Sequence, residues 1–380
     1  MTIHLGAPPD AAGLKQLFTP QTIGSLKLPN RLAVAPMTRV SAEADGRPSR
    51  RMADYYSLFA AGGFGLVITE GIYTDKAFAQ GYLFQPGLTD AVQREAWRIV
   101  VDAVHERGGR IIAQLMHAGA LSQGNPHRSG TVGPSAIRPK GQQMAFYRGS
   151  GDYPLPSAMS VPDITYAKEG FVRAAFYAHE AGFDGVEIHG ANGYLLDQFL
   201  SEGINHRDDL YGGTVEHRLR LTQEVVQAVR AVVGSEMVVG VRASQGKVND
   251  FVYKWRGADE AAAIFTALGR LPVDYIHTTE FEAWKPAFAE GESLAAFAKR
   301  YSGRPVIANG SLHEPRSAAD MIERGEADIV SLGRGALTHA DWPLRVLSNA
   351  PIDEFDRNIL SPLADLANQD RVQTGSSPSL

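Results

Sequence analysis

The stretch PVIANGSLHEPRSAADMIERGEADIVSLGR, residues 305–334, contains the unit from which the fold can be predicted. It begins with the apolar run 305–310 and ends with a second apolar run, 328–334, and both runs stop at polar or glycine residues. The segment between them, 315–324, has the pattern of a helix. Short, continuously apolar runs are typical of strands buried on both faces, so we expect a parallel β–α–β unit here.

The same pattern recurs along the chain, eight times in all. The predicted strands are 32–37, 65–71, 110–117, 185–190, 238–244, 275–280, 305–310 and 328–334. The predicted helices are 48–61, 90–107, 166–181, 214–233, 259–268, 292–301, 315–324 and 341–348. This alternation predicts an α/β fold, a (β/α)8 TIM barrel, rather than an open sheet.

The domain organisation follows from the spacing of these elements. We expect one barrel domain over residues 1–365 and a flexible C-terminal tail over 366–380. The widest gap between predicted elements, 118–164, is rich in Gly, Pro and Ser. It follows the third strand, so we interpret it as a long insertion over the top of the barrel, where substrate loops are common.

Composition excludes several classes of function. The 380 residues include 37 Lys and Arg and 42 Asp and Glu, a net charge of −5, which removes the electrostatic argument for a nucleic acid or an anionic membrane as partner. The absence of cysteine excludes disulfides, thiolate zinc sites and iron–sulfur clusters, so any redox chemistry needs a bound cofactor. Without a targeting segment or a membrane span, a cytoplasmic location is expected.

Polar side chains gather at the carboxyl ends of the predicted strands, where barrel enzymes have their active sites. Arg242 lies within an apolar strand, and a buried guanidinium needs an acceptor. An internal ion pair with Glu187 and contact with a ligand are both open interpretations. The same choice applies to Gln114, whose buried amide is either structural or a ligand contact.

Two glycine turns follow the seventh and eighth strands, ANG at 308–310 and GRG at 333–335. Barrels commonly bind phosphate at this place through backbone N–H groups, and Arg334 would add a charged donor. The alternative is an ordinary change from strand to loop. Neither GxGxxG after a strand nor GxxxxGK[ST] occurs, so the usual nucleotide motifs are missing.

The sequence HGANGY at 189–194 follows the fourth strand. Donors from His189 and Asn192 can converge on one oxygen atom, and Tyr194 offers a weakly acidic proton nearby. The pattern predicts an oxyanion clamp with a proton donor. Without HExxH or GxSxG, we expect neither a metal site nor a serine nucleophile.

The longer stretch HGANGYLLDQFLSEGINHRDDLYGG, 189–213, resembles the signature of the old yellow enzyme family of FMN-dependent ene-reductases. The similarity extends across most of the chain, through segments 17–39, 62–71, 111–119, 238–244, 305–312 and 329–337. The resemblance implies FMN at the top of the barrel. The residues it implies for the cofactor are Pro36, Met37 and Thr38 along the flavin, Gly71 and Gln114 at the pyrimidine ring, Arg242 at the N1/O2 end, and Asn309, Gly310, Gly333 and Arg334 at the phosphate.

The resemblance also implies a reaction. NADPH or NADH would reduce FMN, and an activated alkene (an enone, enal, maleimide or nitroalkene) would then take hydride at its β-carbon. His189 and Asn192 would bind the substrate carbonyl, and Tyr194 would protonate the α-carbon. Apart from the resemblance, Tyr82 lies in a loop, where an aromatic residue either lines the substrate pocket above the flavin or serves only in packing. Thr38 stands where another branch of the family has cysteine. We expect a monomer or homodimer with a small-molecule substrate.

Two other functions remain open. A flavin-free, phosphate-binding aldolase or isomerase would usually carry a Schiff-base lysine at a strand end, and the predicted strand ends have none. An FMN-binding barrel with a non-catalytic role, such as sensing or storage, would have no need of His189, Asn192 and Tyr194.

Overall fold

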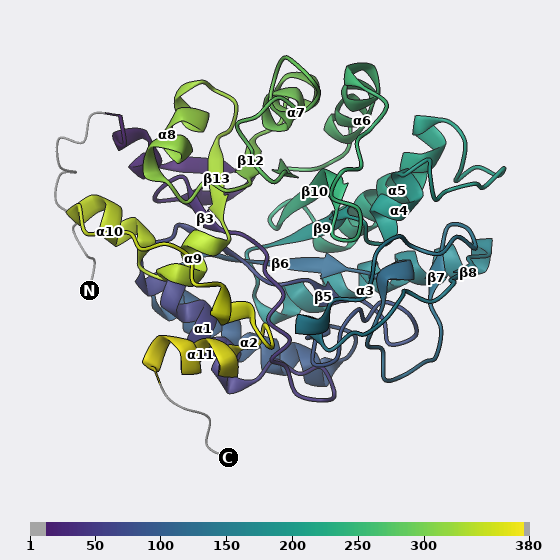
Figure 1. The fold of residues 1–380 in the computed structure, drawn as a ribbon, viewed down its shortest axis with the longest axis horizontal. Helices are drawn as coiled ribbons and strands as arrows, with labels where there is room; N and C mark the ends of the chain where they lie inside the picture. The colour runs from purple at the N-terminus through teal and green to yellow at the C-terminus, as the bar shows by residue number, and fades with distance from the viewer. Residues whose placement is uncertain (1–12, 376–380) are drawn as a thin grey trace.

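The computed structural model describes residues 13–375, which form a closed barrel of parallel strands (Figure 1). Strand β3 pairs with both β13 and β4, and β4 pairs with β6, so the sheet returns to its starting strand. The barrel strands are β3 (Leu32–Val34), β4 (Leu66–Ile68), β6 (Ile111–Met116), β9 (Gly185–Asn192), β10 (Val238–Lys247), β11 (Tyr275–Thr279), β12 (Val306–Asn309) and β13 (Ile329–Leu332). The predicted TIM barrel is confirmed. A short additional strand, β5 (Ile72–Tyr73), pairs with β6.

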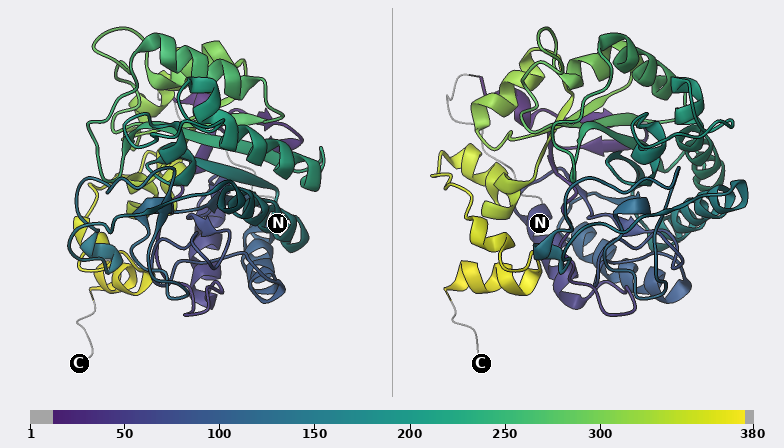
Figure 2. Two further views of the ribbon diagram at one scale, coloured as in Figure 1. Left: turned by 90° about the vertical axis from the view of Figure 1, so that its right-hand side faces the viewer. Right: turned by 45° about the vertical axis from the view of Figure 1, so that its right-hand side comes forward.

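Helices surround the barrel (Figure 2). They are α1 (Arg50–Ala61), α2 (Ala91–Glu106), α3 (Val161–Ala181), α5 (Val215–Val233), α6 (Ala258–Gly269), α7 (Leu294–Ser302), α8 (Pro315–Glu323) and α10 (Trp342–Ser348). Helix α3 begins before its predicted start because Ser160 and Asp163 form a reciprocal capping box around its first turn. None of the helices between residues 13 and 375 is long and apolar enough to cross a membrane.

A hairpin that was not predicted closes one end of the barrel. Strands β1 (Gln21–Ile23) and β2 (Leu26–Leu28) pair antiparallel before the first barrel strand. Their buried side chains pack with an interior layer of the barrel made by Ala33, Leu66, Ile68, Ile112, Val238, Tyr275, Ile307 and Ile329. Most of these residues lie near the amino ends of their strands, so the hairpin leaves the carboxyl ends free for a site.

The insertion and the C-terminal segment contain more structure than expected. The insertion includes β7 (Val132–Gly133) and β8 (Ser157–Ala158), which pair in parallel, and the 3₁₀ turns η2 (Gly119–Leu121) and η3 (Ala145–Tyr147). Another 3₁₀ turn, η1 (Lys15–Phe18), precedes the barrel. Short helices also occur at α4 (Leu195–Leu200) and α9 (Arg334–Thr338).

The prediction of a flexible tail over 366–380 does not match the structure at 366–374. Helix α11 (Leu366–Thr374) begins there, capped by the Asp365 carboxylate, which accepts the N–H of Asn368 at 2.9 Å. The side chain of Asn368 donates to the carbonyl of Asn358 in η4 (Arg357–Leu360), which ties the helix to the preceding turn. These caps are local side-chain contacts that composition does not reveal. Residues 376–380 lie outside the described part.

The hairpin contribution can be tested with Ile23→Ala. Ile23 is fully buried at the end of the barrel, so its truncation should lower the free energy of unfolding by about 2–5 kcal/mol, measured by urea denaturation. Thr22→Ala, at the exposed neighbouring position, is the matched control and should change it by less than about 0.5 kcal/mol. Equal effects from the two variants would contradict the role given to the hairpin.

Candidate active site

The sheet register brings the predicted residues to one end of the barrel. Arg242 on β10 is aligned with His189 on β9 and with His277 on β11. Beyond β11, Asn309 of β12 is aligned with Ser331 of β13. These residues lie toward the carboxyl ends of their strands, as expected for a barrel active site.

The guanidinium of Arg242 is buried and only partly satisfied by the protein. Its Nη2 donates to Oδ1 of Asn309 at 3.0 Å, and its Nε has no partner within residues 13–375. No ion pair with Glu187 is found in this part of the chain, so that interpretation of Arg242 is wrong. A buried donor without an acceptor is costly, and the oxygen or anionic nitrogen edge of a bound flavin would satisfy it.

Glu187 is held by other donors inside the barrel. Gln114 Nε2 donates to Oε1 at 2.8 Å, while the Tyr275 hydroxyl, at 2.9 Å, and His277 Nδ1, at 2.8 Å, donate to Oε2. Burial alone would raise the pKa of Glu187, but His277, Arg242 and Gln114 outweigh it and lower the pKa to about 2. The carboxylate is therefore ionised, and it balances the charge of Arg242 without contacting it.

Gln114 consequently has a structural contact that the sequence left open. Its Nε2 is committed to Glu187, whereas Oε1 accepts no hydrogen bond from the described residues. The amide oxygen can therefore still accept from a ligand such as the N3–H of a flavin pyrimidine ring. The structural contact of Gln114 is found, and its contact with a ligand stays a prediction.

The HGANGY segment places two polar rings, those of His189 and Tyr194, side by side. His189 is 3% exposed, and its Nδ1 has no partner in the described chain. Burial and the charge of Arg242 lower the pKa of His189 to about 3, so the ring is neutral. The ring centroids of His189 and Tyr194 are 5.0 Å apart in an edge-to-face arrangement. A neutral imidazole can form a hydrogen bond with an oxygen atom of a ligand, and the phenol beside it can supply a proton.

Tyr194 and Tyr82 form a direct contact between two predicted site residues. Their hydroxyl oxygens lie 2.5 Å apart, and both rings are buried. Burial raises the pKa of Tyr194 above its ordinary value, while the hydrogen bond from Tyr82 opposes this shift. The phenol of Tyr194 is therefore protonated at neutral pH and available as a proton donor.

Asn192 adopts a conformation that is unusual for a residue with a side chain. Its φ is 61°, in the left-handed region, and its N–H donates to Oγ of Ser244 at 2.8 Å. The next residue, Gly193, has φ 87°. Gly193 therefore joins Asn192, the last residue of β9, to Tyr194, the residue before helix α4.

The glycine turns after β12 and β13 line a cavity of about 240 Å³. Its walls include Asn309, Gly310, Gly333 and Arg334, the residues predicted to hold phosphate. Gly310 has φ +146°, and a Cβ there would lie 2.3 Å from the Glu280 carbonyl oxygen, so no other residue fits without rearrangement. Arg334 donates to Oγ of Ser311 at 2.6 Å and is exposed to the cavity mouth. A cavity with glycine turns and an arginine suits a phosphate group.

The predicted flavin-lining segment follows β3. Pro36, Met37 and Thr38 are half-buried, and the sulfur of Met37 lies 3.6 Å from where a Cβ on Gly333 would stand. Gly71 also faces a sulfur, because a Cβ there would lie 2.4 Å from Sδ of Met116. The segment after β3 is thus close to the phosphate cavity, as FMN would require.

Two residues that hold this segment were not predicted. The carboxylate of Glu70 accepts the N–H groups of Arg39, at 2.9 Å, and Val40, at 3.3 Å. The hydroxyl of Tyr147, from the insertion, donates to the Thr38 carbonyl at 3.2 Å. Glu70 directly precedes Gly71, and a glutamate at the end of an apolar strand was the available signal.

With this geometry in place, the chain can be compared with known proteins. A model of the NADH:flavin oxidoreductase / NADH oxidase family matches residues 16–353. The chain belongs to this family. The predicted membership of the old yellow enzyme family is confirmed, as are FMN with a nicotinamide hydride donor and the class of activity, an oxidoreductase acting on carbon–carbon double bonds.

Relatives of this flavin oxidoreductase span nearly its whole length. 12-Oxophytodienoate reductase 7 of Oryza sativa subsp. japonica is 34% identical over 374 residues, 92% of this chain and 93% of the relative. A probable flavin mononucleotide-dependent alkene reductase of Leishmania infantum is 34% identical over 348 residues, 90% of this chain and 92% of the relative.

Solved structures share the fold of this flavin oxidoreductase. The old yellow enzyme homologue of Zymomonas mobilis superposes with a TM-score of 0.84 at 30% identity, covering 96% of this chain and all (100%) of the other. Morphinone reductase in complex with tetrahydroNAD gives a TM-score of 0.80 at 32% identity, covering 90% and 93%. The roles of single residues are not tested by these similarities and stay predictions.

Glu70 gives the site a pH dependence that can be measured. Burial raises the pKa of Glu70 from 4.5 to about 7. The native carboxyl group therefore binds its proton more tightly than the unfolded chain does, and its contribution to stability falls as the pH rises from about 4.5 through 7. Between pH 5 and pH 8, Glu70 should therefore lower the free energy of unfolding of the parent protein by an amount on the order of 2–3 kcal/mol. Glu70→Gln should abolish this decrease, as measured by urea unfolding of the FMN-loaded protein.

Glu43→Gln is the control for this prediction, because Glu43 is exposed on a nearby turn. It should leave the difference between the two pH values as in the parent protein. A Glu70→Gln protein with the parent's pH dependence would show that another group is responsible.

Proposed function

We propose that His189 and Asn192 bind the carbonyl or nitro oxygen of an activated alkene and that Tyr194 protonates its α-carbon. The observation that carries this proposal is the unpartnered, buried Nδ1 of His189 beside the protonated phenol of Tyr194. The expected substrates are enones, enals, maleimides and nitroalkenes. Each has an oxygen that becomes more negative when hydride adds to the β-carbon.

FMN, when bound, supplies hydride that it has received from NADPH or NADH. The chain's own residues handle the charge and the proton. Because His189 is neutral, it stabilises the developing enolate by a hydrogen bond without taking part in proton transfer, and the amide of Asn192 is the second donor. Arg242, with its unpartnered Nε, would face the N1/O2 edge of the flavin.

Tyr194 loses its proton in this reaction and must be stabilised as it does so. The Tyr82 hydroxyl, 2.5 Å away, can donate to the developing phenolate oxygen. The structure therefore supports a second role for Tyr82, beyond lining the substrate pocket. Because the surroundings are apolar, this single donor is worth more than it would be in water.

The proposal also covers the location of the protein, its oligomeric state and partners other than the small-molecule substrate. We propose a cytoplasmic monomer or homodimer that acts without nucleic acid or membrane. The net charge of −5 supports the second half of this statement, since it provides no general attraction to polyanions.

The structure has a lysine at a strand end, which bears on the aldolase alternative. Strand β10 extends to Lys247, beyond its predicted end at residue 244, so a buried lysine does stand at a strand end. Its Nζ, however, lies 2.5 Å from Oδ1 of Asp197 and is paired as a cation rather than free as a nucleophile. The family and its relatives favour the flavin enzyme over this alternative.

Tyr194→Phe tests the proposed proton donor. Loss of the hydroxyl should slow alkene-dependent reoxidation of the reduced flavin by about 10²- to 10⁴-fold, the usual contribution of a general acid, while NADPH-driven flavin reduction changes by less than about twofold. Anaerobic stopped-flow absorbance separates the two half-reactions.

Tyr153→Phe is the matched control, because Tyr153 belongs to the same buried cluster and its hydroxyl has no hydrogen-bond partner in the described chain. It should leave both half-reactions near the parent rates. Equal loss of both half-reactions in Tyr194→Phe would argue against proton donation.

A further inference from the structure

Lys247 and Asp197 form a buried ion pair that the proposed reaction does not use. Nζ of Lys247 lies 2.5 Å from Oδ1 of Asp197, and the side chains are 5% and 0% exposed. Burial raises the pKa of Asp197 and lowers the pKa of Lys247, so the pairing of the two charges offsets a real desolvation cost.

The pair contacts the segment 189–194, called the catalytic loop from here on, from two directions. Oδ2 of Asp197 accepts the N–H of Gly193 at 2.6 Å, between Asn192 and Tyr194. Lys247 is aligned with Asn192 in the sheet, and the N–H of the next residue, Val248, donates to the Asn192 carbonyl at 3.0 Å. Asp197 therefore holds the Gly193 amide in the middle of the turn. The backbone next to Lys247 holds Asn192, the first residue of the turn.

This turn needs such support. Asn192 and Gly193 both have left-handed φ values, 61° and 87°. Because Asn192 bears a side chain, it adopts this conformation at a cost. The turn persists because hydrogen bonds from outside it determine its shape. Two of these bonds end on Ser244 and Asp197, and Lys247 fixes the carboxylate of Asp197 in turn.

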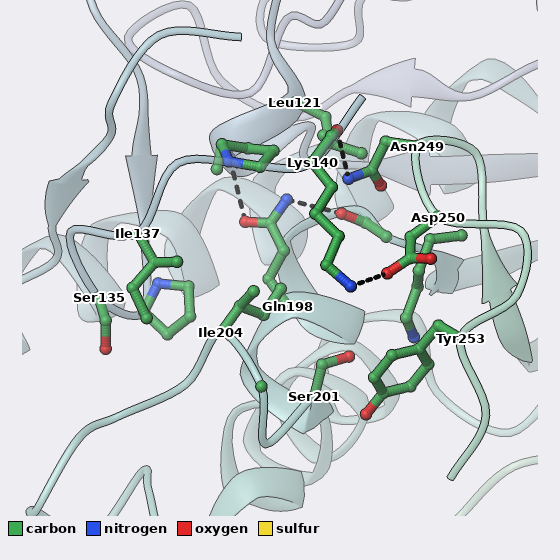
Figure 3. Close-up of a pocket in the computed structure, with 16 residues that line it drawn as sticks. Leu121, Ser135, Ile137, Lys140, Gln198, Ser201, Ile204, Asn249, Asp250 and Tyr253 are labelled. Atoms are coloured by element: carbon green, nitrogen blue, oxygen red, sulfur yellow. Dashed lines mark hydrogen bonds and ion pairs between the residues drawn. The ribbon is translucent and has the colours of Figure 1, made fainter. Parts of the chain in front are cut away.

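Lys247 is itself fixed at the wall of a small cavity. Its Nζ lies 4.4 Å from the centroid of the Tyr253 ring, which adds a cation–π contact. The cavity has a volume of about 120 Å³ and lies between the insertion and the catalytic loop, with Ile137 and Tyr253 on opposite sides (Figure 3). A second ion pair, Lys140–Asp250 at 2.8 Å, lines the same cavity, but Lys140 is 78% exposed. The two pairs differ in burial and in contact with the loop.

We propose that Lys247 is a positioning residue for alkene reduction, acting through Asp197 to hold Asn192 and Tyr194 in their relative places. Its catalytic consequence rests on the proposed function, whereas its effect on the loop does not. A buried ion pair is often no more stabilising than apolar residues of the same size, so geometry rather than stability is what this pair supplies. Without the cation, Asp197 is a buried, unpaired carboxylate, and its hold on Gly193 weakens.

The first test measures how fast the backbone amides of the loop exchange with solvent, and does not depend on enzyme activity. Hydrogen–deuterium exchange of the FMN-loaded protein, read on peptides that cover 189–196, should be about tenfold faster or more in Lys247→Met than in the parent. Lys140→Met, which removes the exposed lysine of the neighbouring pair, is the matched control and should exchange as the parent does. Parent-like exchange in Lys247→Met would overturn the proposal.

The second test asks whether the loop matters for the reaction. In Lys247→Met at saturating 2-cyclohexenone, alkene-dependent reoxidation should fall by about 10- to 100-fold, as expected for a displaced catalytic group, with FMN content unchanged and flavin reduction by NADPH affected less. Equal loss in both half-reactions together with loss of FMN indicates a merely structural role and overturns the proposal. Unchanged reoxidation in a loop that exchanges faster overturns it as well.

A neutral double variant keeps the proposal testable if Lys247→Met fails to fold. Asp197→Asn with Lys247→Met removes both charges of this pair, so neither is left buried without its partner, and the variant should fold while its loop still exchanges faster than the parent loop. A rigid loop in this double variant would overturn the proposal. If the parent protein does not reduce 2-cyclohexenone, the proposed function fails, and the exchange experiment alone decides whether Lys247 holds the loop.

Discussion

The guanidinium of Arg242 is buried at the carboxyl end of the barrel, and its one acceptor among residues 13–375 is the amide oxygen of Asn309. A buried cation of this kind needs a compensating charge and further hydrogen bonds. Glu187 supplies the charge from the neighbouring strand, held by Gln114, Tyr275 and His277. Its Nε has no partner among residues 13–375, so this end of the barrel offers a buried donor that a ligand such as the flavin would satisfy.

The same charge sets the chemistry of the loop beside it. Arg242 helps to lower the pKa of His189, so the imidazole is a neutral hydrogen-bond donor rather than an acid. The proton must therefore come from elsewhere, and Tyr194 is the protonated group next to it. In the proposed reaction, separate residues hold the oxygen and supply the proton, and the left-handed turn at Asn192 and Gly193 lies between them in the chain.

Much of this could be predicted from the sequence because the relevant signals are local. Each barrel strand is a short apolar run, and HGANGY and the glycine turns directly follow strands, so their meeting at one end of the barrel follows from the fold. The partners of residues that contact distant elements could not be predicted in this way. Glu70 holds the segment at 39–40, and Lys247 reaches Asp197, through contacts between distant elements. The hairpin at 21–28 and helix α11 were missed because short strands and side-chain caps leave little periodicity.

The central claim is that this barrel binds FMN and passes hydride from a nicotinamide to an activated alkene. An anaerobic absorption spectrum tests it most directly, with NADPH added first and 2-cyclohexenone second. The account predicts flavin bands that bleach with NADPH and return with the enone. A colourless protein that cannot be reconstituted with FMN would contradict the assignment of the cofactor site, and bands that bleach but do not return would contradict the roles given to His189, Asn192 and Tyr194.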